Sequence, residues 1–87
     1  MDANWLASFQ KKLDDYHSWP TLYVFKFIIP RDKEDDLRKL FPLHTATGKE
    51  SKNGNYTSLT LQMMMPSADA VIDVYKKAAA IEGLIAL

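Results

Sequence analysis

The pattern of hydrophobic and polar positions changes its period along the chain, and each period predicts one kind of element. The densest apolar run extends from Pro20 to Pro30 and is rich in β-branched and aromatic residues, with Lys26 as its single charge. Such residues fit a pleated, buried surface, so the run predicts a strand. Because both of its faces are largely apolar, we expect this strand to be central in a sheet rather than at an edge.

A second long strand is predicted over Asn55–Met65, where apolar and polar residues alternate. Alternate residues of a strand point to opposite faces of the sheet, and the more apolar set is expected to face the core. The expected core set is Thr57, Leu59, Leu61, Met63 and Met65. The expected opposite set is Tyr56, Ser58, Thr60, Gln62 and Met64. In the methionine run, only Met64 is therefore expected to be exposed.

Two weaker strands complete the predicted sheet. Residues 43–49 form one, and Lys52-Asn53-Gly54-Asn55 then supplies an Asn-Gly pair. This pair is typical of a hairpin turn, because both positions tolerate positive φ. Leu84 to Leu87 form the last, short strand.

Residues 3–17 have helical periodicity with a narrow apolar stripe. The helix is expected to stop at Trp19-Pro20, since the residue before proline disfavours the helical conformation. Its stripe must lie on an apolar surface, either of its own domain or of a second subunit. The stripe consists of Trp5, Leu6, Phe9, Leu13 and Tyr16.

A short helix is predicted from Asp32, as N-cap, to about Phe41, with Asp35 at the capping-box position. The acidic residues of its first turn suit the helix dipole but make this terminus a poor phosphate site. Arg31 is the one candidate for binding an anionic ligand at this loop.

The last helix is predicted to begin after Ser67, a favourable N-cap, and to end near Gly83 in a left-handed conformation. Its apolar positions recur at three- and four-residue spacing. They are Val71, Val74, Tyr75, Ala78 and Ile81.

The order strand, helix, strand, strand, helix, strand predicts an α+β fold, the ferredoxin-like βαββαβ plait. Its antiparallel sheet has four strands in the order 4-1-3-2, preceded by an extra N-terminal helix. We therefore divide the chain into an N-terminal amphipathic helix, residues 1–18, and a ferredoxin-like domain, residues 19–87.

The two crossover helices leave one face of this sheet without a helix. This face is too apolar to be fully exposed to solvent. We expect the N-terminal helix, of this subunit or a partner, or a partner's sheet to cover it. The candidate interaction surface consists of Val24, Lys26, Ile28, Tyr56 and Met64 on the strands, with Trp5 and Phe9 on the helix.

Composition narrows the classes of function. The 87 residues suffice for one domain, and 11 basic residues balance 11 acidic ones. A neutral chain lacks the positive field expected of a nucleic-acid or membrane-surface binder. The absence of cysteine excludes disulfides, thiolate metal sites and cysteine nucleophiles. With neither a signal peptide nor a long apolar run, we expect a cytoplasmic protein.

The sequence carries no recognisable catalytic or cofactor motif. His17 and His44 have no carboxylate at ligand spacing, so neither predicts a metal site. Gly48 and Gly54 do not match a P-loop in spacing or in the residues that follow. An RNA-recognition domain would need aromatic residues on the open faces of both central strands, in basic surroundings. On that face the only aromatic residue expected is Tyr56, and the net charge of the chain is zero. We therefore expect no cofactor, no metal and no enzymatic activity.

Three stretches resemble the YbeD-like family of small bacterial proteins of unknown function. They are Tyr23–Pro30, Ser51–Thr60, and Val74–Lys77 leading into Ile81–Ile85. The resemblance spans about Trp19 to Leu87 and is most specific in the Ser-Lys-x-Gly-x-Tyr-x-Ser segment. It implies a plait similar to the ACT regulatory domains in a bacterial cytoplasm, and it supplies no catalytic residues.

Two functions follow as hypotheses. The first is a non-enzymatic regulatory or protein-interaction module that self-associates or binds another protein. The alternative is a small-metabolite sensor, ACT-like, that binds its ligand at a subunit interface near Pro30–Asp32.

Overall fold

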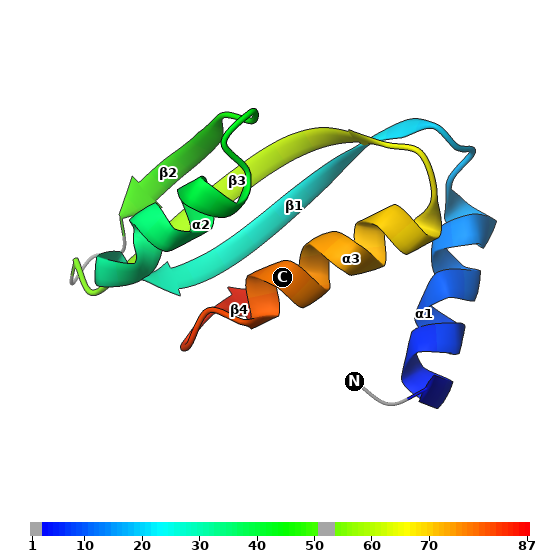
Figure 1. The fold of residues 1–87 in the computed structure, drawn as a ribbon, viewed down its shortest axis with the longest axis horizontal. Helices are drawn as coiled ribbons and strands as arrows, with labels where there is room; N and C mark the ends of the chain where they lie inside the picture. The colour runs from blue at the N-terminus through cyan, green and yellow to red at the C-terminus, as the bar shows by residue number, and fades with distance from the viewer. Residues whose placement is uncertain (1–2, 51–53) are drawn as a thin grey trace.

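The computed structural model describes residues 3–50 and 54–87, which form three α-helices and a four-stranded sheet (Figure 1). The strand order is β2-β3-β1-β4, and every neighbouring pair is antiparallel. The predicted α+β class with four antiparallel strands is thereby confirmed. The elements are α1 (Ala3–Tyr16), β1 (Thr21–Pro30), a 3-10 turn (Arg31–Lys33), α2 (Glu34–Leu40), β2 (Ala46–Glu50), β3 (Tyr56–Met65), α3 (Ala68–Ala79) and β4 (Ile85–Ala86).

The centre of the sheet is the pairing of β1 with β3 along their whole length, from Thr21 opposite Met65 to Pro30 opposite Tyr56. As alternation predicts, one side chain in two enters the core. The predicted core set of β3 is buried throughout, and Met64 is exposed between two buried methionines. On β1 the buried members are Phe25, Phe27 and Ile29.

Helices α2 and α3 cover this core on one side of the sheet. Leu37 from α2 and Val71 and Ala78 from α3 are fully buried in the same cluster as the core-facing strand residues. Ser67 caps α3 as predicted, because its hydroxyl accepts a hydrogen bond from the Ala70 N–H at 3.2 Å.

The predicted start of α2 is wrong. Asp32 lies in the 3-10 turn, Lys33 occupies the N-cap position, and no side chain caps this terminus. The Arg31 N–H instead donates to the Asn55 carbonyl at 2.9 Å, which ties the end of β1 to the start of β3. This tertiary hydrogen bond holds the chain in a tight turn before the helix begins.

The predicted end of α3 is also corrected, since the helix stops at Ala79. Gly83 does adopt positive φ, +83°, but it does so in the turn that leads into β4. A Cβ at this position would lie 2.8 Å from Pro30 Cγ, so the turn needs glycine for space as well as for conformation. At the hairpin, Gly54 has φ +69°, while Lys52 and Asn53 of the predicted turn lie outside the described residues.

Helix α1 packs on its own domain, but not on the sheet face where we expected it. Leu13 is buried, Phe9 contacts Tyr75 of α3 with ring centroids 5.8 Å apart, and Gln10 donates a hydrogen bond to Asp69 at 3.0 Å. Figure 1 shows α1 beside the start of α3. The predicted stripe is covered only in part, since Trp5 is 49% and Tyr16 82% exposed. Of the expected coverings of the other face, the α1 of the same chain is therefore excluded, while a partner's helix or sheet stays a prediction.

Candidate functional site

The face of the sheet opposite α2 and α3 carries the predicted strand residues of the interaction surface. We call it the helix-free face. Val24, Lys26 and Ile28 reach it from β1, and Tyr56 and Met64 reach it from β3, since all five are out of phase with the buried set. Alternation alone predicted this grouping, and the structure brings these residues together.

The apolar part of the helix-free face is concentrated at the end where β1 begins. Leu22 and Met64 are directly opposite each other in the β1–β3 register, and they are 52% and 62% exposed. Val24 lies one step further along the same face and is 44% exposed. At the opposite end, Ile85 of β4 is also exposed beside Ile28. These exposed apolar side chains adjoin one another across the two central strands instead of being scattered singly.

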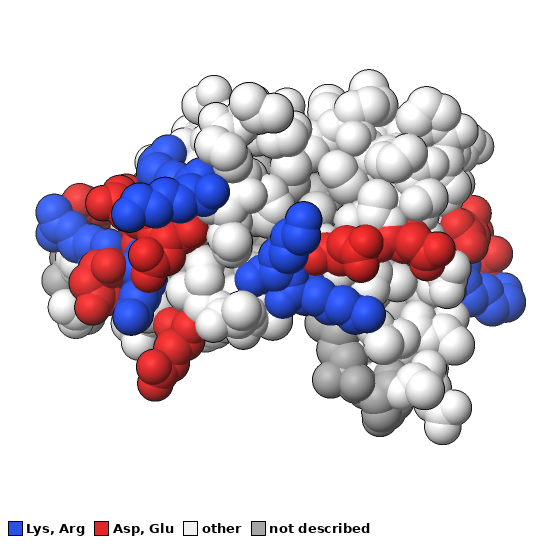
Figure 2. All heavy atoms as spheres, viewed as in Figure 1, with Lys and Arg blue, Asp and Glu red and all other residues white. Residues whose placement is uncertain are grey.

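The middle of the helix-free face is polar and positively charged. Lys26 lies opposite Thr60, which in turn lies opposite Thr47, and Lys49 lies opposite Ser58. None of the described strand residues that point to this face is acidic. On the helix side, by contrast, positive and negative side chains are mixed over α2 and along α3 (Figure 2). The helix-free face therefore combines apolar ends with a cationic centre.

Trp5 and Phe9, predicted to belong to the same surface, lie elsewhere. Their rings are in contact, with centroids 5.1 Å apart, and Phe9 leads on to Tyr75. Together with Tyr23, they line a cavity on the helix-covered side of the sheet. The structure thus separates the predicted surface into a sheet face and an aromatic cavity, a division that the helical period of α1 could not reveal.

Two tyrosines of this cavity share a hydrogen bond. The hydroxyls of Tyr23 and Tyr75 are 3.2 Å apart, and the ring of Tyr75 also contacts Phe25 edge-on at 5.3 Å. Burial in this aromatic cluster, together with the hydrogen bond to Tyr23, raises the pKa of Tyr75 well above its ordinary value. Tyr75 is therefore a neutral hydrogen-bonding group here and not a base.

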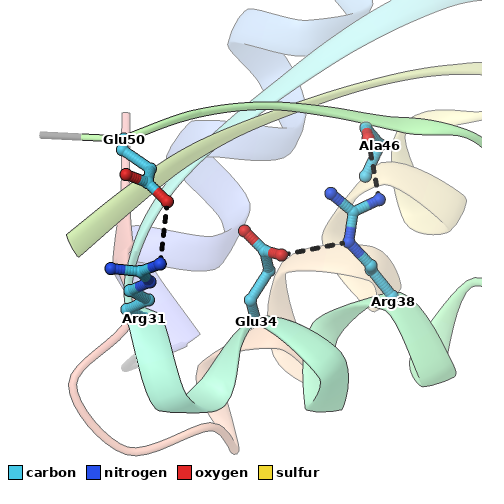
Figure 3. Close-up of polar contacts among 5 residues, drawn as sticks. All are labelled: Arg31, Glu34, Arg38, Ala46 and Glu50. Atoms are coloured by element: carbon cyan, nitrogen blue, oxygen red, sulfur yellow. Dashed lines mark hydrogen bonds and ion pairs between the residues drawn. The ribbon is translucent and has the colours of Figure 1, made fainter. Parts of the chain in front are cut away.

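Arg31, the residue predicted to bind an anionic ligand, forms an ion pair with another residue of the protein. Its guanidinium Nη2 is 3.1 Å from Glu50 Oε1 on β2 (Figure 3). An anion at this loop would have to compete with the Glu50 carboxylate. Within residues 3–50 and 54–87, no cluster of side chains could hold a metal ion, and no helix is long and apolar enough to cross a membrane.

The fold and these surfaces define a small α+β domain whose antiparallel sheet is covered by helices on one face. The sequence matches the model of the family described as "Protein of unknown function (DUF493)" over residues 14–87. The chain belongs to this family, and the YbeD-like resemblance is confirmed. No curated protein and no solved structure matches the chain.

Proposed function

We propose that the protein is a non-enzymatic, regulatory interaction module of the cytoplasm that binds a protein partner on its helix-free face. The observation that carries the proposal is the exposed pair Leu22 and Met64, with Val24 beside them, on the two central strands. An antiparallel sheet commonly leaves one face in water, and that face is then usually polar. Adjacent exposed apolar residues on it therefore favour a surface that a partner covers.

The assignment of the fold to the ferredoxin-like plait, similar to ACT regulatory domains, belongs to the same proposal. It is supported by the strand order β2-β3-β1-β4 and by the placement of α2 and α3 on one side of the sheet. Fold analogy alone is a weak guide to function. The proposed role therefore depends on the exposed face and not on the name of the fold.

The positive charge of the helix-free face favours some kinds of protein partner over others. In a twofold, face-to-face pair of this chain, the Lys26 and Lys49 side chains would add to one positive region, and like charges across an interface are unfavourable. A different protein that presents acidic residues between apolar ones would be complementary. We therefore favour an amphipathic, acidic partner over self-association through this face.

Site-specific crosslinking in the native cell tests the proposal. A photoreactive residue in place of Met64 should crosslink to a discrete protein, whereas one in place of Asp73, exposed on α3, should not. The charge reversal Lys26→Glu should abolish the crosslink from position 64. Lys76→Glu, the same change on α3, should leave it intact. Equal crosslinking from positions 64 and 73, or a product containing only this chain, would contradict the proposal.

The small-metabolite sensor remains the alternative. It requires a ligand near Pro30–Asp32, where Arg31 is now paired with Glu50. A ligand that binds the folded state at about 100 times its dissociation constant stabilises it by about 2.7 kcal/mol. A thermal-shift screen with amino acids and carboxylic acids would show such a stabilisation, and Arg31→Gln should remove it.

A further inference from the structure

One edge of the central strand β1 is open over its first half. Strand β4 pairs with β1 only at Phe27 and Ile28, and the Leu87 N–H donates to the Lys26 carbonyl at 2.9 Å. Backbone groups of alternate residues in a strand point to the same side. The N–H and C=O groups of Leu22 and Val24 therefore point outward at this edge, where no strand of the described residues pairs with them.

A cavity lies beside this open edge, on the helix-covered side of the sheet. Its volume is about 280 Å³, it is open to solvent on one side, and α1, α3 and the end of β4 border it against β1. It is lined by Trp5, Phe9, Tyr23, Tyr75, Ala86 and Leu87.

The chemistry of the cavity suits an apolar side chain. All six lining residues are of aromatic or aliphatic type, and the two tyrosine hydroxyls are hydrogen-bonded to each other. The cavity therefore offers mainly aromatic carbon, and a charged side chain would lose part of its hydration there without gaining a partner.

The register of β4 relates the edge to the cavity. Ala86 lies opposite Phe27, and both belong to the helix-covered side. A peptide strand could pair with β1 in the same register as β4, further toward the start of β1. Its residues on the helix-covered side would then lie opposite Phe25 and Tyr23. Those residues would point into the cavity, because side chains alternate with a period of two.

We infer that the outer edge of β1 at Leu22 and Val24, together with this cavity, binds an extended peptide of a partner protein in antiparallel pairing. Backbone hydrogen bonds would hold the peptide, and an apolar side chain opposite Tyr23 or Phe25 would enter the cavity and select the sequence. We call this the edge site. It is separate from the helix-free face, and it goes beyond the function proposed for that face.

Peptide binding measured by fluorescence anisotropy tests the edge site. The probe is a labelled peptide of about seven residues, an ordinary strand length, in which threonine alternates with valine and a phenylalanine is central. One control peptide has aspartate in place of the phenylalanine. A second is N-methylated at the residues that would donate to β1. Loss of one or two hydrogen bonds should weaken binding about tenfold, and the aspartate should weaken it by at least as much.

Variants of the protein distinguish binding at the edge site from non-specific hydrophobic binding of the peptide. Ala86→Phe should fill the cavity and abolish binding, while Ile85→Phe, whose side chain points to the opposite face, should leave it unchanged. Lys26→Glu, which alters the helix-free face, should also leave peptide binding unchanged. Circular dichroism must show that each variant is folded. On binding, the amide hydrogens of Leu22 and Val24 should become protected from exchange.

Four results would overturn the inference, three from peptide binding and one from sedimentation. The first is equal binding of the N-methylated peptide, and the second is full binding by folded Ala86→Phe protein. The third is no binding of the probe at millimolar concentration. If the wild-type protein sediments as a dimer that the probe dissociates, the edge belongs to a second copy of this chain, and the assignment to a partner peptide is wrong.

Discussion

At the scale of single residues, Thr57 is a polar side chain in the buried core. Its hydroxyl is buried in the core of β3 and has no hydrogen-bond partner in the structure. Alternation placed Thr57 in the core set correctly, but it could not say whether the hydroxyl would be satisfied. An unsatisfied buried hydroxyl lowers the stability of the fold.

Thr57→Val is therefore expected to stabilise the protein. The valine keeps the shape of the side chain and removes the desolvated hydroxyl, which should raise the free energy of unfolding by about 1 kcal/mol. For a domain of this size, that corresponds to an increase in Tm of about 4–8 °C. Thr47→Val, at an exposed position of β2, is the control and should change stability by less than about 0.5 kcal/mol. A lower Tm for Thr57→Val would show that the hydroxyl is satisfied.

Tyr75 gives a prediction about pH. In the folded protein its pKa is raised by burial and by the hydrogen bond to Tyr23, whereas the unfolded chain loses this proton near pH 10. Above about pH 10 the folded state therefore binds more protons than the unfolded state, and the free energy of unfolding falls as the pH rises. Below that pH the contribution is fully present.

The check is a titration of tyrosinate absorbance in the wild type and in Tyr75→Phe. Up to about pH 11 the two folded proteins should give the same absorbance increase, because Tyr75 stays protonated. In denaturant, the wild type should exceed the variant by one tyrosinate. A difference between the folded proteins below that pH would contradict the environment described for Tyr75.

At the scale of elements, Arg38 joins α2 to β2. Its Nη1 donates to the Ala46 carbonyl at 2.8 Å, and its Nε is 3.5 Å from Glu34 Oε2 within the same helix (Figure 3). The first contact crosses between two elements, while the second is an i,i+4 pair that is partly exposed. The two interactions should therefore differ in their effect on stability.

Arg38→Met should lower the free energy of unfolding by about 1 kcal/mol, because it leaves the Ala46 carbonyl without its donor. Glu34→Gln, which removes only the charge of the helical pair, should cost less than about 0.5 kcal/mol. Urea unfolding of the two variants measures both effects. An equal loss of unfolding free energy in both variants would mean that the ion pair with Glu34, and not the hydrogen bond to Ala46, stabilises the position of α2.

The elements also show which parts of the fold could be predicted from the sequence. The two long strands, the core-facing set of β3 and the Ser67 cap were predicted correctly, because periodicity and side-chain chemistry determine them locally. The start of α2 was predicted wrongly, because it depends on the hydrogen bond from Arg31 to Asn55, which forms only when β1 pairs with β3. The position of α1 was also missed, because an apolar stripe fits any apolar surface and only the assembled Tyr23–Tyr75 cluster selects one.

At the scale of the whole molecule, residues 3–50 and 54–87 place helices over one face of the sheet and leave the other face without one. The strand part of the interaction surface could be predicted from alternation. Its separation from Trp5 and Phe9, and the open edge of β1, required the position of α1 and the short pairing of β4. Both follow from contacts between segments that are distant in the sequence.

The methionine run provides the most direct test that the helix-free face is uncovered in the isolated protein and available to a partner. Met63 and Met65 are buried, whereas Met64 is 62% exposed on that face. With methyl-labelled methionine, a soluble paramagnetic probe should broaden the Met64 methyl resonance strongly and leave those of Met63 and Met65 nearly unchanged, at low and high protein concentration alike. A Met64 methyl as protected as its two neighbours would contradict the account, because α1 or a second copy of the chain would then cover the face.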